Sequence, residues 1–93
     1  MTILGTFVKQ PAEQESYSID FTDDMVGSDS IVGSTATVDV AGLTVVSSIT
    51  VGKLIKTTVS GGTNLAKYKV TVTVTTNDGR ILQDEFVVKI KDV

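Results

Sequence analysis

Apolar and polar side chains alternate along much of this chain. The alternation is longest over residues 67–75, where Tyr68, Val70, Val72 and Val74 are each flanked by Lys or Thr. Successive side chains of a strand point to opposite faces, whereas an amphipathic helix repeats every 3.6 residues or so. These residues are therefore predicted to form a strand with one face in the core and the other in solvent.

Other segments with strand character are separated by short runs of Gly, Asp, Asn and Ser. They comprise residues 3–8, 17–21, 31–40, 44–51 and 54–59, and a last strand in which Phe86, Val88 and Ile90 face inward. Within residues 31–40, we expect Ala36, Val38 and Val40 to share one face. Asp78-Gly79 predicts a tight turn that joins the last two strands in a hairpin, because such a turn needs residues that tolerate positive φ.

The composition agrees with this pattern. β-branched residues, which pack well on a pleated sheet, make up 36 of the 93 positions (15 Val, 14 Thr and 7 Ile). About seven short strands in a chain of single-domain length are typical of immunoglobulin-like sandwiches. We therefore predict an all-β fold, a single immunoglobulin-like β-sandwich of about seven antiparallel strands over residues 1–93, with a small β-barrel as the alternative.

Three glycines and one tyrosine are expected to have structural roles. Gly61 and Gly62 lie in the crossing that precedes residues 67–75, and Gly79 lies in the predicted hairpin turn. Tyr68 opens the long strand, where a tyrosine in immunoglobulin-like sandwiches can turn its hydroxyl back onto upstream backbone. The alternative for Tyr68 is an ordinary aromatic of the core.

The side chains that most enzymes use are scarce. The sequence contains no His and no Cys, which excludes Ser-His-Asp and Cys-His nucleophilic sites, disulfides, iron–sulfur clusters and zinc–thiolate sites. Phosphate-loop and Gly-x-Ser-x-Gly motifs are also absent. We therefore expect a protein that is not an enzyme and that needs no cofactor.

Four carboxylates lie within ten residues and are weak candidates for a metal site. Calcium takes oxygen ligands of this kind, but the spacing matches no calcium loop. The alternative is a solvated acidic loop that keeps the domain soluble. The four residues are Asp20, Asp23, Asp24 and Asp29.

Net charge and its distribution along the chain indicate which partners to expect. The net charge is −3, and the few aromatic residues lie in no basic cluster, so we expect no nucleic-acid partner. Apolar runs of two or three residues cannot span a membrane. Residues 1–45 carry a balance of −6 and residues 46–93 one of +3. Such a subunit could dock head to tail with copies of itself, unless the fold intermixes the two halves.

From about Tyr17 to Ile90 the chain resembles the small immunoglobulin-like virion proteins of tailed bacteriophages, of the fibre–tail adaptor or head–tail junction type. Four stretches carry the resemblance. They are Glu15-Ser16-Tyr17-Ser18-Ile19-Asp20-Phe21, Ser60-Gly61-Gly62-Thr63, the strand from Tyr68 to Thr76, and Asp78-Gly79-Arg80 leading to Asp84-Glu85-Phe86-Val87-Val88.

The resemblance implies a non-enzymatic structural protein at the neck or tail of a virion, made in the host cytoplasm. The implied partners are portal, tail or fibre proteins and copies of itself, reached through sheet edges and through the terminal segments 1–11 and 89–93. An adhesion module that recognises a surface glycan or protein is the alternative, and a calcium-stabilised domain of a larger surface protein is a third. The candidate contact residues are Phe7, Lys9, Asp23, Asp24, Lys53, Lys56, Lys89 and Lys91.

Overall fold

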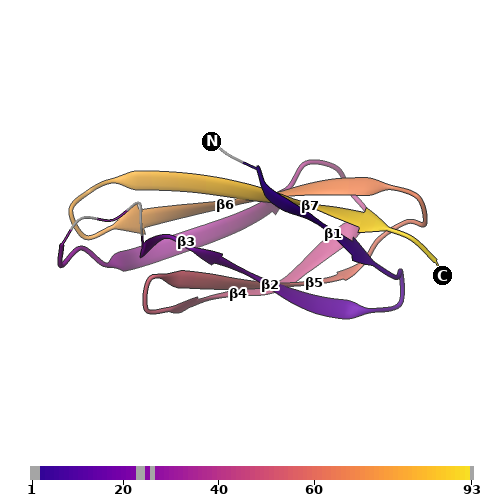
Figure 1. Cartoon of the computed structure of the whole chain (residues 1–93), viewed down its shortest axis with the longest axis horizontal. Helices are drawn as coiled ribbons and strands as arrows, with labels where there is room; N and C mark the ends of the chain where they lie inside the picture. The colour runs from indigo at the N-terminus through magenta and orange to yellow at the C-terminus, as the bar shows by residue number, and fades with distance from the viewer. Residues whose placement is uncertain (1–2, 23–24, 26, 93) are drawn as a thin grey trace.

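The computed structural model describes residues 3–22, 25 and 27–92, and seven strands account for its regular structure (Figure 1). The strands are β1 (Ile3–Lys9), β2 (Gln14–Asp20), β3 (Ile31–Val38), β4 (Leu43–Val51), β5 (Leu54–Gly61), β6 (Lys67–Thr76) and β7 (Ile81–Ile90). Each segment predicted from the alternation overlaps one of them. None of the described residues forms a helix long and apolar enough to cross a membrane.

The strands form two sheets that pack face to face. One sheet has the order β1-β7-β6-β3 and the other the order β2-β5-β4. The two layers follow the long axis of a molecule that measures 44 × 21 × 19 Å (Figure 1). The sheets do not close into a barrel, so the predicted β-sandwich is confirmed and the barrel alternative is wrong.

One strand pair departs from the predicted antiparallel pattern. β1 runs parallel to β7, whereas the other four neighbouring pairs are antiparallel. In the constant-type immunoglobulin sandwich, the first strand lies in the sheet of the second, fifth and fourth strands. Here it has joined the opposite sheet, beside the last strand. This placement brings the end of β1 next to the end of β7.

The core lies between the two sheets and is built from alternate residues of each strand. Val70, Val72 and Val74 of β6 are fully buried, and so are Ile55 and Val59 of the facing strand β5. The burial of alternate residues confirms the period-of-two prediction for residues 67–75. Removing this apolar surface from water is the main favourable contribution to folding.

Val40 does not share the half-buried face of Ala36 and Val38, because 52% of its surface is exposed. β3 ends two residues earlier, where the Asp39 carboxylate accepts a hydrogen bond from the Lys69 backbone N–H at 2.9 Å. The side chain of Asp39 thus takes the place of a backbone carbonyl, and the chain then leaves the sheet. The prediction for Val40 is wrong for this reason.

β6 and β7 form the hairpin that Asp78-Gly79 predicts. Their register pairs Thr75 with Ile81, and Gly79 has a φ of 84°. The turn is attached to the loop before β3, because the Asp29 carboxylate accepts the backbone N–H of Asp78 at 3.0 Å.

Candidate docking groove

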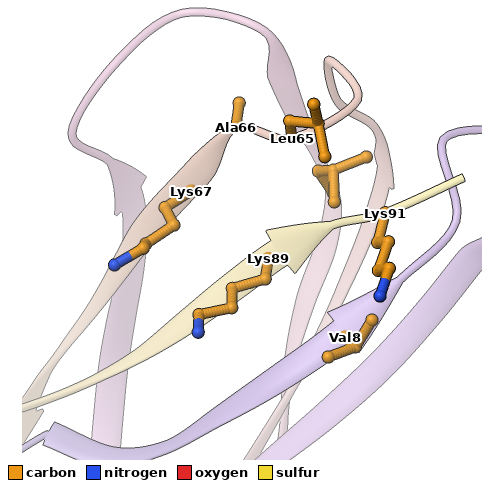
Figure 2. Close-up of a pocket in the computed structure, with 7 residues that line it drawn as sticks. Val8, Leu65, Ala66, Lys67, Lys89 and Lys91 are labelled. Carbon is orange, nitrogen blue, oxygen red and sulfur yellow. The ribbon is translucent and has the colours of Figure 1, made fainter.

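A half-open groove of about 220 Å³ lies on the outer face of the four-stranded sheet, at the end where β7 finishes (Figure 2). β1, β6, β7 and the crossing before β6 all contribute to it. Its walls combine apolar side chains with three ammonium groups. The lining residues are Val8, Leu65, Ala66, Lys67, Lys89, Ile90 and Lys91.

Strand register brings two of the lysines together. Lys67 of β6 and Lys89 of β7 are direct cross-strand partners, and Val8 of β1 pairs with Lys89 from the other side. Figure 2 shows the side chains of Lys67 and Lys89 extended next to each other, with Lys91 beside Val8. Like charges directly opposite in a sheet destabilise it. Within the described part of the chain, no carboxylate forms an ion pair with any of these three lysines.

Leu65 stands at the mouth of the groove in an unfavourable backbone conformation. Its φ is +70°, and 81% of its surface is exposed. A left-handed conformation costs a bulky L-residue of the order of 1–2 kcal/mol. Backbone hydrogen bonds maintain it, because the Leu65 N–H donates to the Ile90 carbonyl at 2.7 Å and the Ile90 N–H donates to the Ala66 carbonyl at 2.9 Å.

The crossing that carries Leu65 is anchored to the core by Tyr68. The Tyr68 hydroxyl accepts a hydrogen bond from the Thr63 backbone N–H at 3.0 Å, five residues upstream. Hydrogen bonding to Thr63 lowers the pKa of Tyr68, against the opposing effect of burial. Gly61 and Gly62 have φ values of 77° and 107°, and a Cβ at Gly62 would overlap the Ile90 side chain. The crossing therefore needs glycine at position 62.

Lys9, at the end of β1, points into the sandwich and is only 1% exposed. Its ammonium group donates to the carbonyl of Gln10 at 2.8 Å and to the carbonyl of Gly61 in the opposite sheet. Burial lowers the pKa of Lys9, partly offset by the charges of Glu13 and Glu15. Lys9, one of the predicted contact residues, therefore joins the two sheets from inside the sandwich.

Phe7 of β1 lies between β1 and β2, which are edge strands of the two sheets. Its ring stacks on Tyr17 with 4.5 Å between ring centroids and meets the buried Phe86 edge-on at 5.9 Å. It remains 38% exposed. Burial raises the pKa of Tyr17, and the charges of Glu15 and Glu13 add to the effect. The ring of Phe7 thus packs against the core on one side and is open to solvent on the other.

The remaining predicted contact residues do not gather in one place. Lys53 is half-buried and donates to the Gly27 carbonyl at 3.2 Å, at the opposite end of the sandwich, and Lys56 is exposed on the outer face of the other sheet. Asp23 and Asp24 lie outside the described residues. Lys89 and Lys91 are the two predicted contact residues that the structure places in the groove.

The two described carboxylates among the proposed metal ligands, Asp20 and Asp29, hydrogen-bond with the chain itself. Asp20 accepts the hydroxyl and the backbone N–H of Thr22, and these bonds lower its pKa. Asp29 is buried, which by itself would raise its pKa, but hydrogen bonds from Thr76, Asp78 and Ser30 and the charge of Arg80 produce a net lowering. Among the described residues, no three potential ligands of His, Cys, Asp or Glu type come together. Asp23 and Asp24 lie outside that set.

Sequence reasoning missed Val8, Leu65 and Lys67 as groove residues. The position of Lys67 could have been found by counting back from the Asp78-Gly79 turn, because hairpin register pairs it with Lys89. The position of Val8 could not, because it depends on β1 joining β7 rather than β2. No sequence signal marks a leucine that adopts a positive φ.

The chain is thus a small β-sandwich with a basic, partly apolar groove on the outer face of one sheet. Residues 9–89 match the family model of Gp77, described as podophage GP4 fiber-tail adaptor protein gp77. The chain belongs to this family, and the resemblance to phage fibre–tail adaptors is confirmed. No curated protein sequence is significantly similar to the chain.

Proposed function

We propose that this chain is a non-enzymatic structural component of a tailed-phage virion, where it connects tail and fibre proteins. The observation that carries the proposal is the family match over residues 9–89, since the family consists of fibre–tail adaptors. An adaptor acts by presenting surfaces to two or more partners. The basic groove and the open side of Phe7 are two such surfaces at one end of the sandwich.

The strands within the terminal segments, β1 and the end of β7, contribute to the proposed contacts. β1 forms one edge of the four-stranded sheet, where no strand of the described residues pairs with its outer side, and the end of β7 borders the groove. An unpaired edge can accept a strand from another chain. Strands from residues 1–45 pair with strands from residues 46–93 in both sheets, so the fold intermixes the two halves and their charge difference gives no argument for self-association. We propose that copies of the chain assemble with each other and with other virion proteins.

Co-expression with the tail, fibre and portal proteins of the same phage tests this function. We expect the tagged chain to co-purify with at least one of them, and mass spectrometry to detect the chain in purified particles. A chain that is absent from particles and binds none of these proteins would contradict the proposal. A specific signal on a glycan array would instead support the adhesion alternative.

A further inference from the structure

We propose that the groove binds an acidic segment of a partner protein, with its carboxylates on Lys67, Lys89 and Lys91 and an apolar side chain between Val8 and Leu65. The proposal rests on the adaptor function and adds to it the surface and the chemistry of the partner. It follows from the charge of the groove, from its size and apolar walls, and from the conformation of Leu65.

The charge of the groove is unbalanced within the described chain. Register forces Lys67 and Lys89 opposite each other, Lys91 follows on the same border, and none of them has an ion-pair partner among the described residues. A carboxylate placed between Lys67 and Lys89 would replace their repulsion with two charge-assisted hydrogen bonds. An acidic occupant is therefore the one that complements this surface.

The size and walls of the groove favour a side chain over a small-molecule ligand. A volume of about 220 Å³ lies below the range of about 300–1,000 Å³ that is usual for small-molecule pockets. Val8 is 62% exposed and Leu65 is 81% exposed. Contact with an aliphatic side chain would bury apolar surface of both residues, which is favourable. The occupant must therefore combine carboxylates with at least one apolar group.

Leu65 supplies an independent argument. A bulky apolar residue that is exposed and also held at a φ of +70° contributes little to the stability of the free chain. Backbone strain of this kind occurs preferentially at ligand-binding and switch sites. The backbone hydrogen bond from Leu65 to Ile90 holds this residue at the mouth of the groove, where an incoming segment would cover its side chain.

A protein segment fits these features better than a nucleic acid. No aromatic side chain lines the groove to stack on a base, and the chain has a net charge of −3. Phosphate recognition commonly uses arginine forks, and the groove is lined by lysines. The acidic partner is therefore assigned as protein, and nucleic acid becomes an outcome of the test.

Amide NMR of the whole chain with a synthetic probe tests the groove directly. The probe is a short capped peptide, Glu-Asp-Leu-Asp-Glu, and its control is Gln-Asn-Leu-Asn-Gln. We expect the acidic peptide to shift the amides of residues 8, 65–67 and 89–91, and the control peptide to leave them in place. Raising the ionic strength should weaken the shifts, because the contacts are exposed to solvent.

Variants test whether the groove lysines are responsible for binding the acidic peptide. In the double variant Lys67→Gln/Lys89→Gln, affinity for the acidic peptide should fall about tenfold, since two exposed charge pairs are lost. Lys69→Gln, which removes an exposed lysine of the same strand that does not line the groove, should bind like the wild type. Equal binding by the double variant, shifts elsewhere on the chain, or larger shifts of the same amides with a thymidine oligonucleotide would each overturn the proposal.

Co-purification separates this proposal from the adaptor function. If the wild type binds tail or fibre proteins and the double variant does not, while Lys69→Gln does, the groove proposal is supported. If the double variant binds as strongly as the wild type, the adaptor function stands and the groove proposal is wrong. If the wild type binds none of them, the adaptor function itself fails, and peptide NMR alone decides whether the groove takes acidic segments.

Discussion

The backbone of Gly42 lies so close to Tyr68 that a Cβ at position 42 would overlap the Tyr68 hydroxyl and lie 3.1 Å from its Cζ. Gly42 belongs to the turn between β3 and β4 and has a φ of 128°, while Tyr68 is the second residue of β6. The same hydroxyl accepts the Thr63 N–H from the crossing beside the groove. Tyr68 therefore packs against one connection and hydrogen-bonds with another at this end of the sandwich.

Substitution of Gly42 should be costly for two separable reasons. Gly42→Ala combines a disfavoured φ with steric overlap, and we expect the melting temperature to fall by about 10 °C. Gly79→Ala has a φ of 84° and nothing within 4 Å of the added Cβ, so it measures the backbone cost alone and should lose about half as much. Thermal unfolding followed by circular dichroism provides the comparison.

The overlap with Tyr68 has its own test. Tyr68→Phe removes the hydroxyl, so its effect in the Gly42→Ala background should be smaller than in the wild type. If the two substitutions were additive, the steric contact would not be the cause. Gly33→Ala serves as the control, because position 33 has open space and no positive φ, and it should leave stability unchanged or slightly raised.

Lys9 should make the free energy of unfolding depend on pH in the alkaline range. Its folded-state pKa is lowered from 10.5 by burial, so in the interval below 10.5 the unfolded chain binds more protons than the folded chain. The slope of the free energy of unfolding against pH is therefore positive in this interval, and stability should rise with pH from the folded-state pKa up to 10.5. Below the folded pKa, the charged and buried Lys9 opposes folding, although its two hydrogen bonds offset part of that cost.

Lys9→Met isolates this contribution. The difference between the free energies of unfolding of the wild type and the variant, from urea titrations at a series of pH values, should change in favour of the wild type between neutral pH and pH 10.5. Taking the difference cancels the tyrosines and the other lysines, which are common to both chains. A difference that stays constant over the whole range would contradict the lowered pKa.

Asp29 should make the stability of the fold depend on pH in the acidic range. The pKa of its carboxyl group lies below the ordinary 3.8, so the carboxylate contributes stability that is present above the unfolded-state pKa and is lost as the pH falls through the folded value. Asp29→Asn keeps an acceptor for the Ser30 and Asp78 N–H groups but removes the titration. Its acid-unfolding curve should be flatter than that of the wild type below about pH 4.

The exposed Asp92 provides the matched control for Asp29. Asp92→Asn removes a carboxylate whose side chain accepts no hydrogen bond among the described residues, and its acid-unfolding curve should follow that of the wild type. An Asp29→Asn curve that also matches the wild type would mean that hydrogen bonding at this turn does not depend on the carboxylate charge.

The sequence predicted the layers of this fold but only part of the site. Alternation placed Val70, Val72 and Val74 in the core because the period of two is a local property of a strand. The parallel pairing of β1 with β7 is a long-range choice that no local pattern encodes, and it decides that Val8 borders the groove. The inward direction of Lys9 follows from the same pairing, because its neighbour across the sheet is the buried Ile90.

The lysine pair of the groove should reduce the stability of the free chain. Lys67 and Lys89 are opposite each other, so Lys89→Glu replaces a cross-strand repulsion with an attraction and should raise the melting temperature by about 3 °C at low salt. Added salt should raise the melting temperature of the wild type and lower the advantage of the variant, since the charges are exposed. Lys56→Glu, on the outer face of the other sheet, controls for the change in net charge. If Lys89→Glu stabilised the chain no more than Lys56→Glu, the repulsion between the two groove lysines would be negligible, and their juxtaposition would impose no cost that a bound carboxylate could relieve.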